Sequence, residues 1–99
     1  MEDGGDVAVY CAGFKDTFAL DDAYCAGRIV AKLAGERTDG ARAAELLAAS
    51  FPTALAAFEA RTYGPPGLEA DIAYCAQVDL LDTVPRFARM VGPAAEIVA

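Results

Sequence analysis

The feature that most constrains this chain is an abrupt change of hydrophobic period near residue 13. Residues 7–12, VAVYCA, form an uninterrupted apolar run that ends at Gly13, a pattern typical of a buried strand. From Phe18 the apolar residues instead recur with the spacing of one helix face. Those residues are Leu20, Ala23, Tyr24, Gly27, Val30, Ala31 and Ala34. The sequence therefore predicts a short buried strand, a loop and a long helix.

Three further helices and two short strands are expected downstream. The expected helices cover residues 41–49, 52–61 and 68–76, and the expected strands cover residues 78–84 and 96–99. Thr38 or Asp39 can cap the second helix, and Pro52 falls in the first turn of the third. Residues 64–67, GPPG, form a loop, and Pro85 places the strand before it near a sheet edge. The predicted class is α/β, resembling part of a larger α/β domain.

Charge and length exclude two classes of partner. The 99-residue chain has a formal net charge of −7, whereas binding to nucleic acid or to an anionic membrane surface needs a basic face. Residues 46–58, the longest uncharged stretch expected to be helical, are shorter than the ~20 residues of a bilayer span. We therefore expect one partial domain over residues 1–99, with a flexible tail at 1–6, in the cytoplasm.

The tripeptide Tyr-Cys-Ala occurs three times and contains every cysteine, namely Cys11, Cys25 and Cys75. The chain has no histidine and its three cysteines are widely spaced, so it has neither a catalytic Cys–His pair nor the close ligand pairs of a structural zinc site. The odd number of cysteines fits a reducing compartment better than a disulfide framework. We expect three buried packing residues, one ending the strand and two on helices. A reactive thiol of low pKa is the alternative.

Aspartates gather in two parts of the chain. They are Asp16, Asp21 and Asp22 near the start of the first helix, and Asp71, Asp79 and Asp82 in the second half. In α/β folds, ligands bind outside the carboxyl ends of strands, and carboxylate oxygens suit hard divalent cations. Asp16 and Asp22 are therefore candidate ligands of such a cation. Helix capping and solubility are the alternative roles.

Two blocks of the sequence resemble the 2-phosphosulfolactate phosphatases of coenzyme M biosynthesis. Residues 9–33, VYCAGFKDTFALDDAYCAGRIVAKL, are similar to a signature of an apolar strand ending in Cys-Ala-Gly, a brief loop, a Phe-Ser-Leu-Glu-Asp-type helix start and a second Cys-Ala-Gly. The matching residues are Cys11, Ala12, Gly13, Phe18, Leu20, Asp22, Cys25, Ala26 and Gly27. Residues 69–87 resemble the family's C-terminal element at Asp71, Cys75, Asp79, Val84 and Pro85. Ala19 replaces the family's serine, and Thr17 stands where a basic residue is expected.

The resemblance implies Mg²⁺-dependent hydrolysis of a small anionic phosphate ester, 2-phosphosulfolactate, to sulfolactate and phosphate. It implies catalytic roles for Asp22 and Asp16 and metal ligation by Asp22 and Asp79. Gly13 is the implied substrate-binding residue, with Lys15 or Arg28 replacing the basic residue missing at position 17.

The resemblance covers nearly this whole chain but only the C-terminal portion of a family member. Three hypotheses therefore stay open: a phosphatase domain that is active, with dimerisation as a way to rebuild the site; a truncated relative without activity; and a small non-catalytic interaction domain. Because a lone strand at residues 7–12 exposes unpaired edges, we also expect a homodimer or a partner that completes the sheet.

Overall fold

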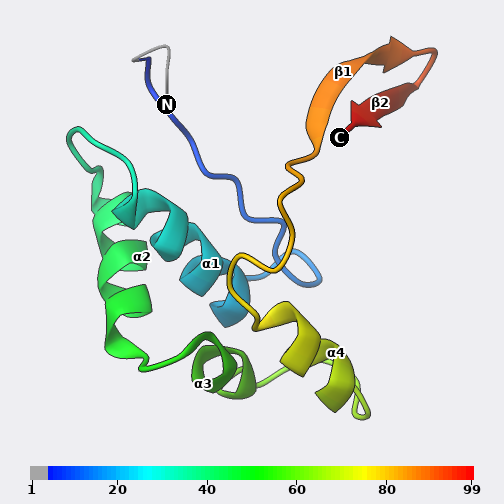
Figure 1. The fold of residues 1–99 in the computed structure, drawn as a ribbon. Helices are drawn as coiled ribbons and strands as arrows, with labels where there is room; N and C mark the ends of the chain where they lie inside the picture. The colour runs from blue at the N-terminus through cyan, green and yellow to red at the C-terminus, as the bar shows by residue number, and fades with distance from the viewer. Residues whose placement is uncertain (1–4) are drawn as a thin grey trace.

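In a computed structural model that describes residues 5–99, the chain forms four helices and one antiparallel two-stranded sheet (Figure 1). The helices are α1 (Leu20–Ala31), α2 (Asp39–Ser50), α3 (Ala54–Glu59) and α4 (Glu69–Cys75). The strands are β1 (Arg86–Val91) and β2 (Ala94–Val98). The mixed α/β class predicted from the sequence is confirmed.

The helix boundaries follow the local chemistry of the chain. Thr38 caps α2 as expected, because its hydroxyl accepts a hydrogen bond from Ala41 N at 3.2 Å. Thr53 caps α3 in the same way, so this helix begins two residues after Pro52 and not at it. At the start of α1, Ala19 offers no side-chain cap, in line with the departure noted in the sequence.

Helices α1 and α2 pack most closely at Gly27. A Cβ atom at this position would lie 2.0 Å from the carbonyl oxygen of Ala44 and 2.8 Å from Cβ of Ala48. Only glycine allows this approach of the two backbones. The helix face predicted from the spacing is confirmed in part, since Ala23, Tyr24, Gly27 and Val30 are buried. Ala31 and Ala34 are exposed instead, and Ala26, which the spacing did not include, is buried.

The core is small and is centred on Tyr24. Its ring makes edge-to-face contacts with Phe51 and Phe58, with centroids 6.2 and 5.8 Å apart. The other buried members of this cluster are the small residues Ala48 and Ala57. Because alanine buries little area, the helical part gains limited hydrophobic stabilisation.

The buried strand predicted at residues 7–12 is wrong. This segment has no strand assignment, and its residues are exposed apart from the half-buried Val9. A strand needs a neighbour for its N–H and C=O groups, and none pairs with this segment within residues 5–99. The expected tail at 1–6 lies mostly outside the described residues, which begin at Gly5.

The two strands predicted near the C-terminus also differ from those in the structure. Residues 78–84 contain no strand, and the sheet begins at Arg86, after Pro85. Strand β1 pairs with β2 in an antiparallel hairpin, with a register shift between Phe87 and Arg89. The strand expected at 96–99 is confirmed in part by β2.

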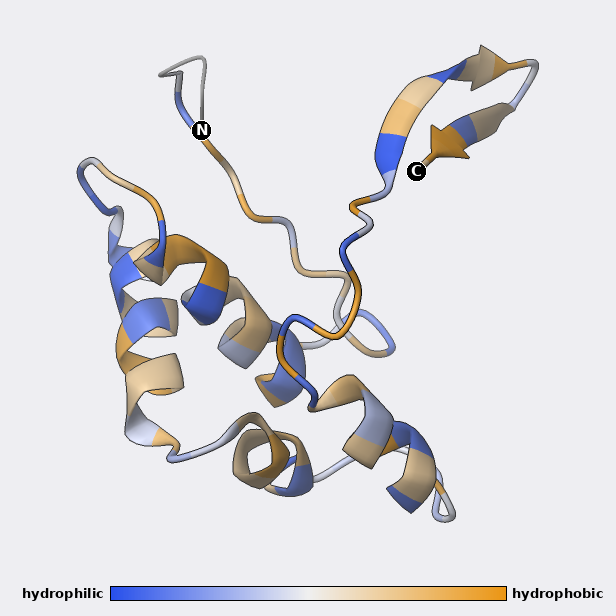
Figure 2. Cartoon of the chain, viewed as in Figure 1, coloured by the Kyte–Doolittle hydropathy of each residue, from blue (hydrophilic) through white to orange (hydrophobic). Residues whose placement is uncertain are grey.

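The hairpin stands apart from the helices (Figure 1). Its large apolar side chains are exposed. They are Phe87, Met90, Val91, Ile97 and Val98. Figure 2 shows hydrophobic residues in orange on both strands, interrupted by hydrophilic residues in blue. Among the described residues, no helix is long and apolar enough to cross a membrane.

Candidate functional site

A tight turn at residues 14–17 lies just before α1. Thr17 N donates to Phe14 O at 3.0 Å, and Phe14 N donates to Thr17 O at 3.1 Å. Lys15 and Asp16, the two central residues, have positive φ angles of 50° and 61°. Type I′ turns have this pattern, but they normally use Asn or Gly at these positions. Such backbone strain in non-glycine residues is more frequent at functional sites than elsewhere.

The residue before this turn, Gly13, connects it to α1. Gly13 N donates a hydrogen bond to Asp22 Oδ2 at 2.8 Å. Gly13 has φ +78°, and a Cβ there would lie 2.8 Å from Thr17 O, so the position requires glycine. The Cys11 thiol also reaches α1, at 3.7 Å from the backbone oxygen of Asp22. The half-buried Asp22 carboxylate is therefore held against the turn.

Tyr63, from the connection between α3 and α4, completes this arrangement. Its hydroxyl donates to Asp21 Oδ1, and its ring lies 4.6 Å from that of Phe14 at an interplanar angle of 36°. Partial burial, followed by the hydrogen bond to Asp21 and the charges of Asp21 and Asp22, raises the pKa of Tyr63 to about 12. The hydroxyl is therefore protonated at neutral pH and acts as a donor.

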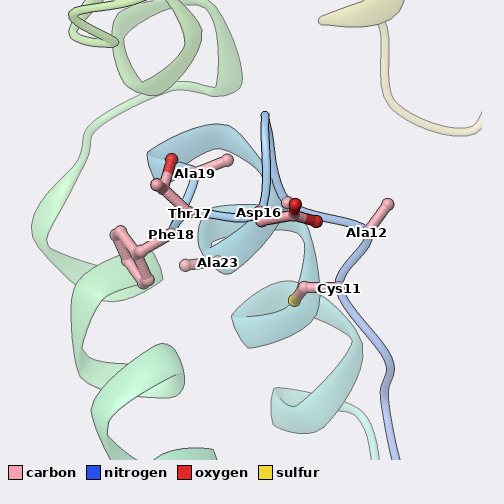
Figure 3. A pocket seen from close by; sticks show the side chains of 8 residues that line it. Cys11, Ala12, Asp16, Thr17, Phe18, Ala19 and Ala23 are labelled. Carbon is pink, nitrogen blue, oxygen red and sulfur yellow. The ribbon is translucent and has the colours of Figure 1, made fainter.

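Two open hollows of about 300 Å³ each adjoin this region. The first lies beside the tight turn, and Figure 3 shows its lining side chains, among them Cys11, Asp16 and Phe18. The second lies between the start of α1 and the α3–α4 connection, and includes Asp22 and Arg61. Both have volumes at the lower end of the range for small-ligand sites.

The structure brings some of the predicted site residues together and separates others. Gly13 and Asp22 are hydrogen bonded, and Gly13 and Asp16 line the first hollow. Lys15 is at the tip of the turn, with its Nζ 5.5 Å from the centroid of the Phe14 ring. Gly13 is a predicted substrate-binding residue, and in this structure its N–H donates to Asp22.

Arg28 and Asp79 lie outside this arrangement. Arg28 is exposed, and its Nη1 donates to the Tyr24 hydroxyl at 3.3 Å. It is six residues after Asp22, which places it about 9 Å along the helix and about 120° away around the axis, so the two residues do not share a face. Asp79 is exposed beyond α4 and lines neither hollow. Their binding and metal-ligating roles stay predictions.

The expectation that the cysteines are buried is wrong. Cys11, Cys25 and Cys75 are free and exposed. In the second copy of the motif, Tyr24 is buried in the core against Phe51 and Phe58, and Ala26 is also buried, whereas Cys25 lies between them on an exposed side of α1. Cys25 and Cys75 line the second hollow. Partial burial there raises the pKa of the Cys25 thiol, and the charges of Asp21 and Asp22 raise it further.

The carboxylates beside the turn provide fewer ligands than Mg²⁺ requires. Within residues 5–99, no three His, Cys, Asp or Glu side chains converge on a point where they could hold a metal ion. One Asp22 oxygen is occupied by Gly13, and Asp21 Oδ1 accepts from both Tyr63 and the Asp22 backbone N–H. These residues therefore do not form a complete magnesium site by themselves.

Sequence reasoning missed three residues of this region: Asp21 as a hydrogen-bond acceptor, Tyr63 and Arg61. Asp21 was placed in the first helical turn, where a dipole interaction explains it equally well. Tyr63 and Arg61 precede the GPPG loop, and their distance of about 40 residues from α1 in sequence hides the contact. Only a resemblance extending through this loop could have drawn attention to them.

Comparison with known proteins matches the family described as 2-phosphosulpholactate phosphatase over residues 1–89. A probable 2-phosphosulfolactate phosphatase of Thermus thermophilus is 38% identical over 98 residues, covering 90% of this chain and 41% of that protein. Another from Pseudothermotoga lettingae is 39% identical over 87 residues, covering 82% of this chain and 39% of that protein. No solved structure gives a significant match.

These comparisons assign the chain to a family of phosphatases. The chain belongs to the 2-phosphosulfolactate phosphatase family. It spans about two-fifths of the length of the curated relatives it matches, corresponding to their C-terminal part.

Proposed function

We propose that this chain supplies part of the active site of an enzyme that hydrolyses 2-phosphosulfolactate to sulfolactate and phosphate. The observation that carries the proposal is the hydrogen bond from Gly13 N to Asp22 Oδ2, because it holds a carboxylate beside a strained turn in a member of a phosphatase family. The names of the relatives support the substrate. A place in coenzyme M biosynthesis and a cytoplasmic location are predictions that accompany it.

The side chains divide the work of phosphate-ester hydrolysis between them. Asp22 Oδ1 accepts no hydrogen bond from the described residues, so it is available to orient an attacking water. Lys15, at the tip of the turn, has a flexible cationic side chain that suits an anionic phosphoryl group. Asp16 beside it is the second candidate acid–base group, with direct access to solvent.

Dependence on Mg²⁺ is a further part of the proposal. Mg²⁺ in phosphoryl-transfer sites is usually bound by one or two carboxylates, with substrate oxygens and water as the other ligands. Asp22 is the candidate ligand in this chain, and Asp79 the second one predicted from the resemblance. The missing ligands would come from substrate, from solvent or from family sequence that this chain does not cover. When bound, the ion would offset charge on the phosphoryl oxygens.

The proposal is tested by phosphate release from 2-phosphosulfolactate, measured for the purified chain with Mg²⁺ and with a chelator. Asp22→Ala is the test variant, and Asp82→Ala, at an exposed site, is the matched control. Turnover that the chelator and Asp22→Ala abolish and Asp82→Ala retains would support the proposal. Turnover that survives Asp22→Ala would refute the role of Asp22. If the folded chain has no turnover, it lacks activity by itself.

A second candidate function is a non-catalytic interaction domain that needs a partner or a second copy. The observation in its favour is the exposed apolar surface of β1 and β2, together with a core in which no large side chain of residues 5–99 is fully buried. Light scattering tests it: a homodimer or a stable complex supports association, and a monomer at all concentrations argues against a homodimer.

A further inference from the structure

Tyr63 joins two separate segments at the candidate site. Its ring packs on Phe14, the first residue of the tight turn, and its hydroxyl donates to Asp21 in the first turn of α1. These are the same two segments that the hydrogen bond from Gly13 to Asp22 connects. One side chain, 42 residues from Asp21 in sequence, therefore bridges both sides of that bond.

The bridge extends to Asp22 through Asp21. Asp21 Oδ1 accepts from the Tyr63 hydroxyl and also from the backbone N–H of Asp22, at 3.0 Å for the latter. Hydrogen bonds thus link Tyr63 to Asp21 and Asp21 to the Asp22 backbone, and a separate bond links the Asp22 carboxylate to Gly13. Because the Asp22 N–H and carboxylate belong to one residue, fixing its backbone restricts the positions that the carboxylate can take.

We propose that Tyr63 is a positioning residue of the candidate site, which holds the tight turn and the start of α1 together so that Asp22 is oriented before substrate binds. The catalytic consequence rests on the proposed function, whereas the positioning itself does not. Tyr63 contacts Asp22 only through Asp21, and so it acts through its neighbours.

Two features of Tyr63 suit this role. Its hydroxyl is protonated over the whole physiological range, and the hydrogen bond to Asp21 contributes to its raised pKa of about 12. The chain that follows it contains Gly64 and Gly67, both with positive φ, and two prolines, and has no regular structure. Tyr63 therefore fixes the start of an otherwise irregular connection on α1, at the edge of the hollow that contains Asp22.

The test compares Tyr63→Phe, which keeps the ring and removes the hydroxyl, with Tyr10→Phe. Tyr10 is 95% exposed and serves as the matched control. Amide hydrogen exchange is measured by NMR at Gly13, which reports on its bond to Asp22, and at Ala48 in α2, which reports on overall stability. Phosphate release from 2-phosphosulfolactate gives kcat and KM for the same variants.

We expect Tyr63→Phe to speed exchange at Gly13 about tenfold relative to Ala48, because it removes a hydrogen bond to a charged group. Tyr10→Phe should leave both sites unchanged. Equal acceleration at Gly13 and Ala48, or none at Gly13, would overturn the positioning role.

A second variant separates the two contacts of Tyr63. Phe14→Leu removes the ring contact and retains the Tyr63 hydroxyl, so we expect a smaller acceleration of exchange at Gly13. An exchange rate at Gly13 equal to that of the unchanged chain would show that the ring contact has no part in the positioning. In a chain with turnover, Tyr63→Phe should lower kcat by about tenfold with little change in KM, and an unchanged kcat overturns the catalytic consequence. If the unchanged chain has no turnover, the proposed function fails for this chain alone while exchange at Gly13 still decides the positioning.

Discussion

Asp22 Oδ2 accepts a hydrogen bond from Gly13 N at 2.8 Å, across nine positions of the sequence. This bond fixes the helix start relative to the tight turn, where Lys15 and Asp16 adopt positive φ angles. The geometry depends on both partners, because Gly13 has no room for a side chain and Asp22 supplies the acceptor. The two residues therefore form a unit whose disruption should affect stability and activity together.

Asp22→Ala should lower the free energy of unfolding by about 1–2 kcal/mol, because the Gly13 N–H loses a charged acceptor. Urea denaturation followed by circular dichroism measures this. Asp82→Ala is the control and should stay within about 0.5 kcal/mol of the unchanged chain, as expected for an exposed residue. Equal stability of the two variants would show that the bond contributes little in solution.

Gly27→Ala should destabilise the helical part by about 3 kcal/mol. Its methyl group would overlap the carbonyl oxygen of Ala44, which belongs to a helix backbone and cannot move aside without separating α1 from α2. Gly40→Ala, also on a helix, is the matched control, since nothing lies within 4 Å of its added Cβ. That control should gain up to about 1 kcal/mol from helix propensity. Thermal unfolding of both variants distinguishes these opposite signs.

The helices could be predicted from the sequence because their signals are local. The apolar spacing identified Ala23, Tyr24, Gly27 and Val30 on the buried face of α1, and Thr38 was one of two candidate caps for α2. The apolar run at residues 7–12 indicates burial, but a strand forms only where a neighbour satisfies its backbone. No such neighbour lies within residues 5–99, so this non-local condition could not be deduced from the run itself.

The candidate site could be predicted only in part. Asp22 and Gly13 were identified from a resemblance, and the structure brings them together. Tyr63 could not be identified, because a contact between residues 42 positions apart has no periodic signal. The prediction for the cysteines was wrong for another reason. Cysteine is usually buried, but on α1 the neighbouring Tyr24 occupies the core, and Cys25 lies on an exposed side of the helix.

Tyr63 should titrate with a pKa of about 12, above the ordinary value of a tyrosine. Because this folded-state pKa lies above the ordinary value of 10, the contribution of Tyr63 to stability is complete below pH 10 and is lost as the pH rises toward 12. Near-ultraviolet absorbance against pH should show a late step that Tyr63→Phe removes. A late step that persists in the variant belongs to another tyrosine.

All three thiols should react with iodoacetamide in the folded chain, and Cys25 should react most slowly. Its raised pKa leaves less thiolate at pH 8, and the thiolate is the nucleophile. Mass spectrometry of peptides after timed labelling gives each rate. Labelling in urea is the control, since unfolding removes the influence of Asp21 and Asp22 and should bring the three rates together. Fast labelling of Cys25 in the folded chain would contradict the prediction.

Removal of the hairpin should leave the helical part as stable as before, because β1 and β2 contact each other and not the helices in any substantial way. A variant ending at Pro85 should have a free energy of unfolding within about 0.5 kcal/mol of that of the unchanged chain, as for other changes at exposed positions.

An isolated two-stranded hairpin is only marginally stable in water, so its exposed apolar side chains favour pairing with a second sheet. Light scattering should therefore show self-association of the unchanged chain that the shortened variant has lost. Arg89→Ala, which breaks only the ion pair with Glu96, is the matched control and should still associate. A shortened variant that unfolds more easily would show instead that the hairpin packs on the helices in solution.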